Sequence, residues 1–413
     1  MSKTTSQRKT IRRAAVVFLI APLLMGPPGL GAETEAKLGD ALRKGRVLAA
    51  LRYRYEGVDQ IGFPDGGEAS TLRTALGYET AEWRRMRLLV EFEDVTDIGL
   101  GDKHDNGASG DLDNGVSGRP VIADPEDTEV NQARLNVVAA AHLGIVVGRE
   151  ELNVVDERFV GASAFRQNHQ TLDLVRVAYD REDGPSGTYA YLDGANRVTG
   201  DRKPLVGHVL FARVPIGDAL AVRGTALLLD YERAADAGLS SRTFAVGASY
   251  ALPTGAWKLS FDAEISQQSD AGDNPAALDE PYARATIEAR RGTLTFGSGY
   301  ELLGGDGVVA FQTPLATLHK WNGWVDKFLT TPAAGLDDAW ISVAGNAGAV
   351  RLTAVLHDFS ADETGTSYGT EWNFEALYTA SWKQKFALTA GRYDADGFAT
   401  DTTKVWLWTS WML

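Results

Sequence analysis

The chain has 413 residues, no cysteine, 44 glycines and a formal net charge of −14 at pH 7. Aromatic residues make up 9% of it, which excludes a disordered chain. The lack of cysteine excludes a disulfide scaffold, and no stretch of about 20 apolar residues suggests a spanning helix. The acidity argues against a nucleic-acid partner, because phosphate binding depends on lysine and arginine.

The N-terminus has the layout of a secretory signal peptide. Residues 1–13 carry five basic residues and no acidic one, residues 14–25 are apolar, and small residues lead to Ala32. The apolar run is too short to cross a bilayer, and the alternative is a buried N-terminal helix. We place the cleavage after Ala32, so that 1–32 is the signal peptide and 33–413 is the mature domain. Cleavage leaves a mature chain with a net charge near −19.

The mature chain alternates between apolar and polar residues, which predicts strands with two different faces. In residues 257–265, for example, every odd position is apolar and every even position is polar. The pattern predicts 18 strands, with 16 as the alternative count. They are 46–55, 71–80, 84–95, 129–140, 142–149, 170–180, 186–194, 204–215, 218–231, 241–252, 256–267, 281–290, 293–302, 337–346, 349–359, 370–381, 384–394 and 403–413.

The connectors between these strands alternate between short and long. Short turns and long loops in alternation are typical of a transmembrane β-barrel, with the turns at the periplasmic rim and the loops outside the cell. Lipid offers no hydrogen-bond partner, so such a sheet must close on itself. The sequence therefore predicts an all-β, closed antiparallel barrel in the outer membrane of a Gram-negative bacterium. Its partners would include outer-membrane lipid and lipopolysaccharide.

Two blocks of sequence resemble one known family. The first block comprises 129–133 (EVNQA), 148–152 (GREEL), 157–161 (ERFVG), 165–168 (FRQN), 171–173 (TLD) and Arg176. The second comprises 311–314 (FQTP), 319–324 (HKWNGW), 326–332 (DKFLTTP), 335–336 (GL) and Asp338. Together they resemble the alginate-export porins, although that family usually has Gln at the position of Glu150 and Trp at that of Phe165. The resemblance implies a monomeric 18-stranded barrel that passively conducts an anionic polymer or solute.

In a barrel, the polar row of each strand faces the lumen, and several of these rows carry arginine. Guanidinium groups in a narrow pore raise the occupancy of anions and match carboxylates in pairs of hydrogen bonds. The alternative is that the charges only brace the barrel as interior salt bridges. The predicted pore-lining residues are Arg52, Arg54, Arg73, Arg85, Arg87, Glu91, Glu93, Arg134, Arg149, Arg176, Asp262, Glu264, Arg284 and Arg351.

Two long loops, 150–169 and 303–336, are expected to fold inward and narrow the channel, with outward display as the alternative. Their candidate constriction residues are Arg158, Arg166, His319, Lys320 and Lys327. The loop Gly99–Pro120 is rich in Gly and Asp, and its spacing resembles a Ca²⁺ loop without completing the motif. We therefore interpret it as a solvated surface loop and predict no metal site.

Together these features predict an outer-membrane channel without a cofactor or catalytic activity. The sequence lacks a His-Glu-x-x-His pattern, a nucleophile elbow and a phosphate loop. By resemblance, the permeant is an anionic polysaccharide or oligosaccharide, and periplasmic export partners are possible. One alternative is a general or substrate-specific porin that takes up small anionic nutrients. Another is a non-conducting surface barrel, whose interior charges would be balanced.

Overall fold

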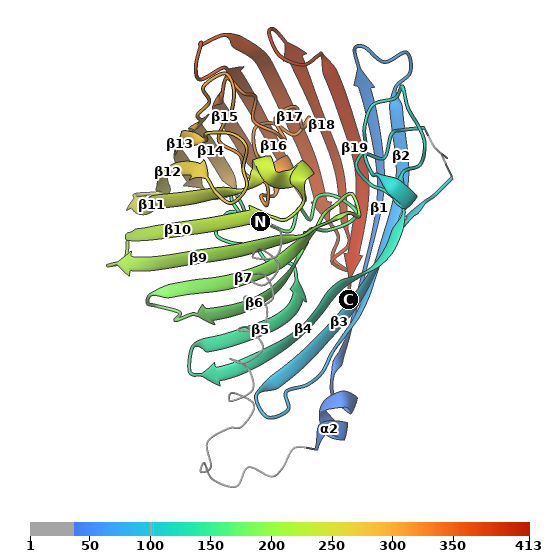
Figure 1. Ribbon diagram of the computed structural model, residues 1–413, viewed down its shortest axis with the longest axis vertical. Coiled ribbons are helices and arrows are strands. Elements are labelled where there is room, and N and C mark those ends of the chain that lie inside the picture. Colours follow the sequence, from blue (N-terminus) through green and yellow to red (C-terminus); the bar gives the residue numbers. More distant parts are fainter. Residues whose placement is uncertain (1–36, 100, 102) are drawn as a thin grey trace, which may run out of the picture.

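A computed structural model describes residues 37–413 except residues 100 and 102. The predicted signal peptide lies outside the described residues. The wall of the molecule is built from 18 long strands (Figure 1). They are β1 (Arg46–Gln60), β2 (Gly67–Glu79), β3 (Met86–Asp97), β4 (Asp127–Ala140), β5 (Leu143–Glu150), β6 (Thr171–Tyr179), β7 (Ser186–Asn196), β9 (Leu205–Ile216), β10 (Leu220–Tyr231), β11 (Ser241–Thr254), β12 (Trp257–Asp270), β13 (Asp279–Arg291), β14 (Leu294–Leu303), β15 (Leu336–Ala347), β16 (Val350–Ser360), β17 (Ser367–Thr379), β18 (Lys385–Ala395) and β19 (Thr402–Met412).

Four short helices and one very short strand complete the described secondary structure. The short strand β8 (Arg202–Lys203) adds to the end of β7. The helices are α2 (Leu38–Arg43) and the 3₁₀ turns η1 (Gly110–Leu112), η2 (Ala234–Leu239) and η3 (Leu318–Lys320). Within the described part of the chain, no helix is both long and apolar enough to cross a membrane.

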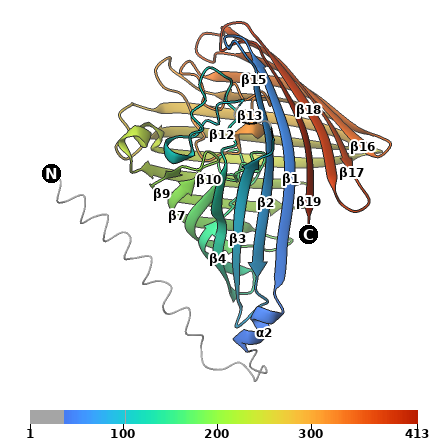
Figure 2. The same ribbon diagram turned by 90° about the vertical axis from the view of Figure 1, so that its right-hand side faces the viewer.

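The sheet closes into a barrel. Every long strand pairs antiparallel with its neighbours in the chain, and β1 pairs with β19 from Ala50–Met412 to Gln60–Thr402. Figure 2 shows β1 between β2 and β19, where the first and last strands of the sheet meet. The predicted count of 18 wall strands is confirmed, and the alternative of 16 is wrong. Each predicted range overlaps one observed strand, and the ends differ by at most five residues.

The alternating rows face lipid and lumen as the pattern predicts. In β12, Phe261 and Ile265 are exposed on the outside, whereas Glu264 is buried on the inside. In β19, Leu407 is outside and Trp406 is buried inside. A closed barrel with an apolar outer surface is the architecture of Gram-negative outer-membrane proteins, and the chain is a protein of that membrane.

Short turns gather at one rim and long loops at the other, so the rims are periplasmic and extracellular. The long loop between β3 and β4 contains two copies of Asp-Asn-Gly, at 105–107 and 113–115. Asn106 donates a hydrogen bond to the Leu112 carbonyl (2.7 Å), and Asn114 donates one to the His104 carbonyl (2.8 Å). The asparagine of each copy therefore binds the carbonyl of the residue just before the other copy. These two reciprocal hydrogen bonds stabilise the loop.

Candidate functional site

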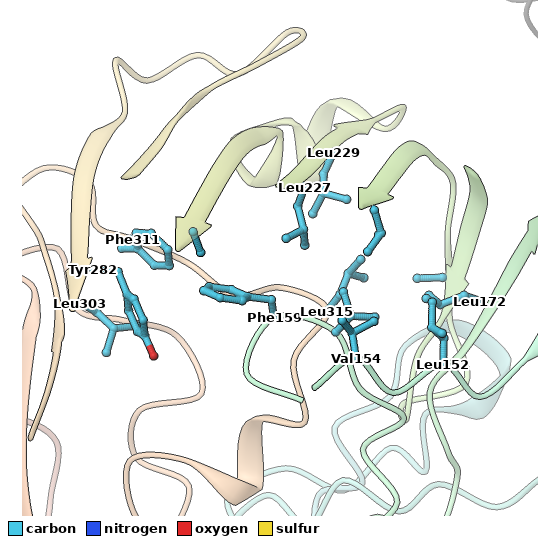
Figure 3. Packing of buried hydrophobic residues seen from close by; sticks show 14 of the residues in the cluster. Leu152, Val154, Phe159, Leu172, Leu227, Leu229, Tyr282, Leu303, Phe311 and Leu315 are labelled. Carbon is cyan, nitrogen blue, oxygen red and sulfur yellow. The ribbon is translucent and has the colours of Figure 1, made fainter. Parts of the chain in front are cut away.

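Two loops occupy the extracellular part of the lumen. Residues 151–170 join β5 to β6, and residues 304–335 join β14 to β15. Their apolar side chains join inward-facing wall residues in one buried cluster, in which Phe159 of the first loop lies between Phe311 and Leu315 of the second (Figure 3). The inward path predicted for both loops is therefore the observed one, and it narrows the lumen.

Arg158 fixes the first loop to the wall and to the second loop. Its side chain is only 1% exposed, and its Nε donates to Glu301 Oε1 of β14 over 2.7 Å. The two terminal nitrogens donate to Thr313 and Asn322 of the second loop, each over 3.2 Å. Burial acts to lower the pKa of Arg158, but the charge of Glu301 outweighs burial and raises it. The guanidinium is thus a permanent buried cation with every nitrogen bonded.

A second buried cluster joins both loops to β1 and β19. Arg166 donates to Glu56 (3.2 Å) and to Asp326 (2.6 Å). Asp326 also accepts from Lys404 (3.0 Å) and contacts His319 Nδ1 (2.7 Å). We call these five residues the latch. Burial acts to raise the pKa of Asp326, but Lys404 and the other basic partners hold it well below its usual value.

The imidazole in the latch also takes part in a stack of rings. His319 lies 3.5 Å from Phe165, centroid to centroid, with the two rings nearly parallel, and Trp406 meets both rings edge-on. Burial lowers the pKa of His319, and the opposing charge of Asp326 is weaker. The imidazole is therefore mostly neutral at pH 7 and acts as a flat packing surface within the latch.

Two arginines of β1 hold the first loop against the wall. Arg54 donates to the carbonyl of Phe165 in the first loop and bonds Asp124, which lies in the loop before β4. Arg52 donates to Gln167 Oε1 and to the carbonyl of Ala164, each over 2.7 Å. No carboxylate among the described residues forms an ion pair with Arg52, and its hydrogen bonds all go to neutral oxygens. Arg52 thus differs from most of the predicted wall arginines.

The arginines of the neighbouring strands are paired with acids. Arg73 of β2 donates to Glu93 of β3 over 2.6 Å. Arg176 of β6 and Arg134 of β4 share Glu150 of β5, at 2.6 Å and 3.4 Å. The predicted arginine row thus exists on this wall, and its charges are largely balanced by carboxylates.

The opposite wall carries a second paired cluster. Arg223 of β10 donates to Asp262 (2.6 Å) and Glu264 (2.8 Å) of β12. Arg284 of β13 bonds Asp156 of the first loop and lies 3.3 Å from Asp262. The predicted residues Asp262, Glu264 and Arg284 therefore meet, and they do so around an arginine that the sequence analysis did not select.

Several predicted wall residues lie near the periplasmic rim or lack an arginine partner. Arg85 is in the turn between β2 and β3, with a φ of 63°, rather than in a strand. Arg87 is the second residue of β3 and its side chain is 53% exposed, paired with Glu82 at 3.2 Å. Arg351 is exposed near the start of β16. Glu91 accepts hydrogen bonds from two amide side chains of β4.

Arg149 lies on the other face of its strand from Glu150. It donates to Asp173 of β6 over 2.8 Å, and Asp173 also accepts from Arg202 over 3.0 Å. Because Glu150 meets the lumen arginines, strand alternation directs Arg149 away from them. The sequence could not decide this, since the two charged residues are adjacent and only the phase of the strand separates them.

The two predicted lysines of the second loop differ. Lys320 donates to the carbonyl of Asp156 (2.8 Å) and pairs with Glu157 (3.3 Å). Lys327 is half-buried and forms no hydrogen bond or ion pair with any residue that the structure describes. Burial, with the nearby charge of Lys404, lowers the pKa of Lys327 to about 8. Lys327 is thus a cation without a fixed partner beside the latch.

Sequence reasoning missed the acids and the arginine that anchor the loops. Arg223 and Glu301 stand on the inward rows of predicted strands, so the alternation could have found them. Asp326 and Asp124 stand in loops, where no periodic signal exists. No three His, Asp or Glu side chains in the described residues are arranged to hold a metal ion.

Comparison with known proteins shows the fold. No family model matches the chain, and no curated protein matches its sequence. OpdK of Pseudomonas aeruginosa, solved with vanillate, matches with a TM-score of 0.71 and 15% identity over 90% of this chain and 99% of that one. OccK9 (OpdG) of the same species gives 0.71 and 14% over the same shares. OccAB4 of Acinetobacter baumannii gives 0.70 and 13% over 89% and 98%.

These matches support a porin-type barrel of the outer membrane. At identities near 15%, the likeness establishes the barrel and its connectivity. It does not single out the alginate-export family, which the sequence blocks resemble.

Proposed function

We propose that the protein is a passive outer-membrane channel selective for small anionic nutrients. The observation that carries the proposal is the narrowed lumen, in which two anchored loops leave Arg52 and Lys327 without carboxylate partners. Two such cations in a site of low dielectric attract an anion and release it again, because neither belongs to a closed ion pair. The protein would act as a monomer surrounded by lipid and lipopolysaccharide, and it would need no cofactor.

Small solutes fit this lumen better than a polymer does. The cavities next to the inner loops have volumes of about 350 and 270 Å³, whereas a polysaccharide needs a continuous passage for a chain of linked sugars. The solved OpdK carries vanillate, a small aromatic carboxylate. Both points favour nutrient uptake over the alginate export that the sequence resemblance implies.

A non-conducting surface barrel is the second candidate, and the balanced ion pairs favour it. Arg73, Arg134, Arg158 and Arg284 all have carboxylate partners. A barrel closed for structural reasons would need such balance. The difference between the two candidates is whether ions pass at all.

Planar-bilayer recording of the purified protein separates the candidates. In a KCl gradient, we expect discrete channels whose reversal potential shows a preference for chloride. Sodium benzoate should carry current, whereas an oligouronate of six sugars should not. A cation preference, or no channels, would overturn the proposal, and passage of the oligouronate would restore polysaccharide export.

A further inference from the structure

A cavity of about 350 Å³ lies between the extracellular loops, beside the latch. Its walls come from the β3–β4 loop, the β5–β6 loop, the segment after β7, the loop after β10 and the β14–β15 loop. Arg166, His319 and Asp326 of the latch are among the residues that line it. A solute that enters from outside therefore meets this cavity next to the constriction. We call it the antechamber.

Arg197 places a held cation in the antechamber. One terminal nitrogen donates to Gln170 Oε1 and to the carbonyl of Pro314, each over 2.5 Å. Gln170 is itself buried and bound to the carbonyls of Gly161 and Leu315. The guanidinium is therefore positioned by a rigid network that uses only one of its nitrogens.

The other nitrogens of Arg197 have no partner among the described residues, and no carboxylate pairs with it. The remaining edge of the guanidinium can hold a carboxylate through two parallel hydrogen bonds. Lys203, which also lines the cavity, is already bound to Asp236. Arg197 is thus the cation of the antechamber whose charge is not neutralised.

The rest of the antechamber is largely apolar, with hydroxyl groups between the apolar side chains. Leu239, Leu318 and Leu329 line it, together with Thr199 and Thr330. A volume of 350 Å³ corresponds to roughly a dozen water-sized groups, at about 30 Å³ each. A ligand of this size with one charged end and one apolar end matches both the arginine and the leucines.

We propose that the antechamber is a binding site for a small monocarboxylate with an apolar ring, held by Arg197 before it passes the latch. The inference rests on the proposed function, because it assumes that anions pass the barrel. It adds a site that sets size and hydrophobic preference outside the constriction. The apolar end of the ligand would lie against the three leucines.

Equilibrium binding of benzoate to the purified protein tests the site independently of conduction. We expect wild-type protein to bind benzoate. Acetate, which lacks the ring, and benzyl alcohol, which lacks the charge, should bind at least about tenfold more weakly. Arg197→Gln should also weaken benzoate binding about tenfold or more, since it removes a charge-assisted contact. The matched control is Arg242→Gln, which changes an exposed arginine of β11 outside the antechamber and should leave binding unchanged.

Arg197→Lys guards against a folding defect, because it retains the charge and loses only the forked geometry. It should bind benzoate with intermediate affinity. Equal affinity in wild type and Arg197→Gln would overturn the antechamber, even if the channel prefers anions. Channels without anion preference would overturn the proposed function, whatever the binding assay gives.

Discussion

The extracellular and periplasmic parts of the lumen hold their charges in different ways. Near the extracellular side, Arg158 and Glu301 are each 1% exposed and bonded to several partners. Near the periplasmic rim, Arg87 and Glu82 are 53% and 45% exposed and share a single contact. A buried pair costs several kcal/mol if one member is removed, whereas an exposed pair contributes about 0–1 kcal/mol. The charges near the extracellular side therefore fix the positions of the loops. The charges near the periplasmic rim contribute mainly to the electric field in the lumen.

The largest expected effect is the loss of the latch acid. Asp326→Asn leaves Arg166 and Lys404 buried beside a neutral amide, at a cost of roughly 3–5 kcal/mol. The second loop should then detach from the wall, so that single-channel conductance rises and its fluctuations increase. The control is Asp273→Asn, which removes an exposed acid from the β12–β13 loop. Unchanged conductance in Asp326→Asn would show that the latch does not hold the loop.

The next test compares a buried and a half-buried arginine directly. Arg158→Met should lower the thermal unfolding midpoint clearly, because Glu301 is left buried without its cation, a loss of about 3–5 kcal/mol. Arg134→Met removes a side chain that is 24% exposed, and it should cost clearly less, because Glu150 keeps its ion pair with Arg176. Thermal unfolding in detergent micelles measures both. Similar midpoints for the two variants would abolish the distinction between fully buried and partly exposed ion pairs.

A smaller effect is expected on ion selectivity. Arg52→Gln removes a cation that no carboxylate neutralises, so the preference for chloride should fall several-fold. Arg87→Gln removes an exposed, paired charge that salt screens within about 8 Å, and it should change the preference little. Reversal potentials in a KCl gradient give both values, and Arg52→Lys is the charge-conserving control. An equal loss in Arg52→Gln and Arg87→Gln would mean that position in the lumen does not matter.

The fold was accessible from the sequence because a spanning strand obeys a strict local rule. Lipid on one side and water on the other impose the period of two seen in β12, and turn length marks the two rims. The same rule placed Arg52, Arg73 and Glu264 on the inside. The rule could not decide which of the adjacent charged residues Arg149 and Glu150 faces the lumen. It also could not show that Arg85 lies in a turn and not in a strand.

The partners within the lumen could not be predicted, because they depend on loop paths. Arg158 meets Glu301, 143 positions away, and Arg166 meets Asp326, 160 positions away. No local pattern encodes such pairs, and they form only after the barrel has closed and the loops have packed inside. The sequence predicted an excess of positive charge in the lumen. In the structure, most of the lumen arginines form ion pairs with acidic residues.

The smallest expected effect concerns Lys327 and pH. Because burial lowers its pKa to about 8, the ammonium is charged below that pH and neutral above it. The wild-type preference for chloride should therefore decline as pH rises from about 7 to 9. The decline should be modest, because Lys327 is only one of several cations in the lumen. Lys327→Met should lack this step, whereas Lys320→Met, which removes a lysine paired with Glu157, should retain it. If reversal potentials show the same step in Lys327→Met, another group titrates there and Lys327 does not face the permeant ion.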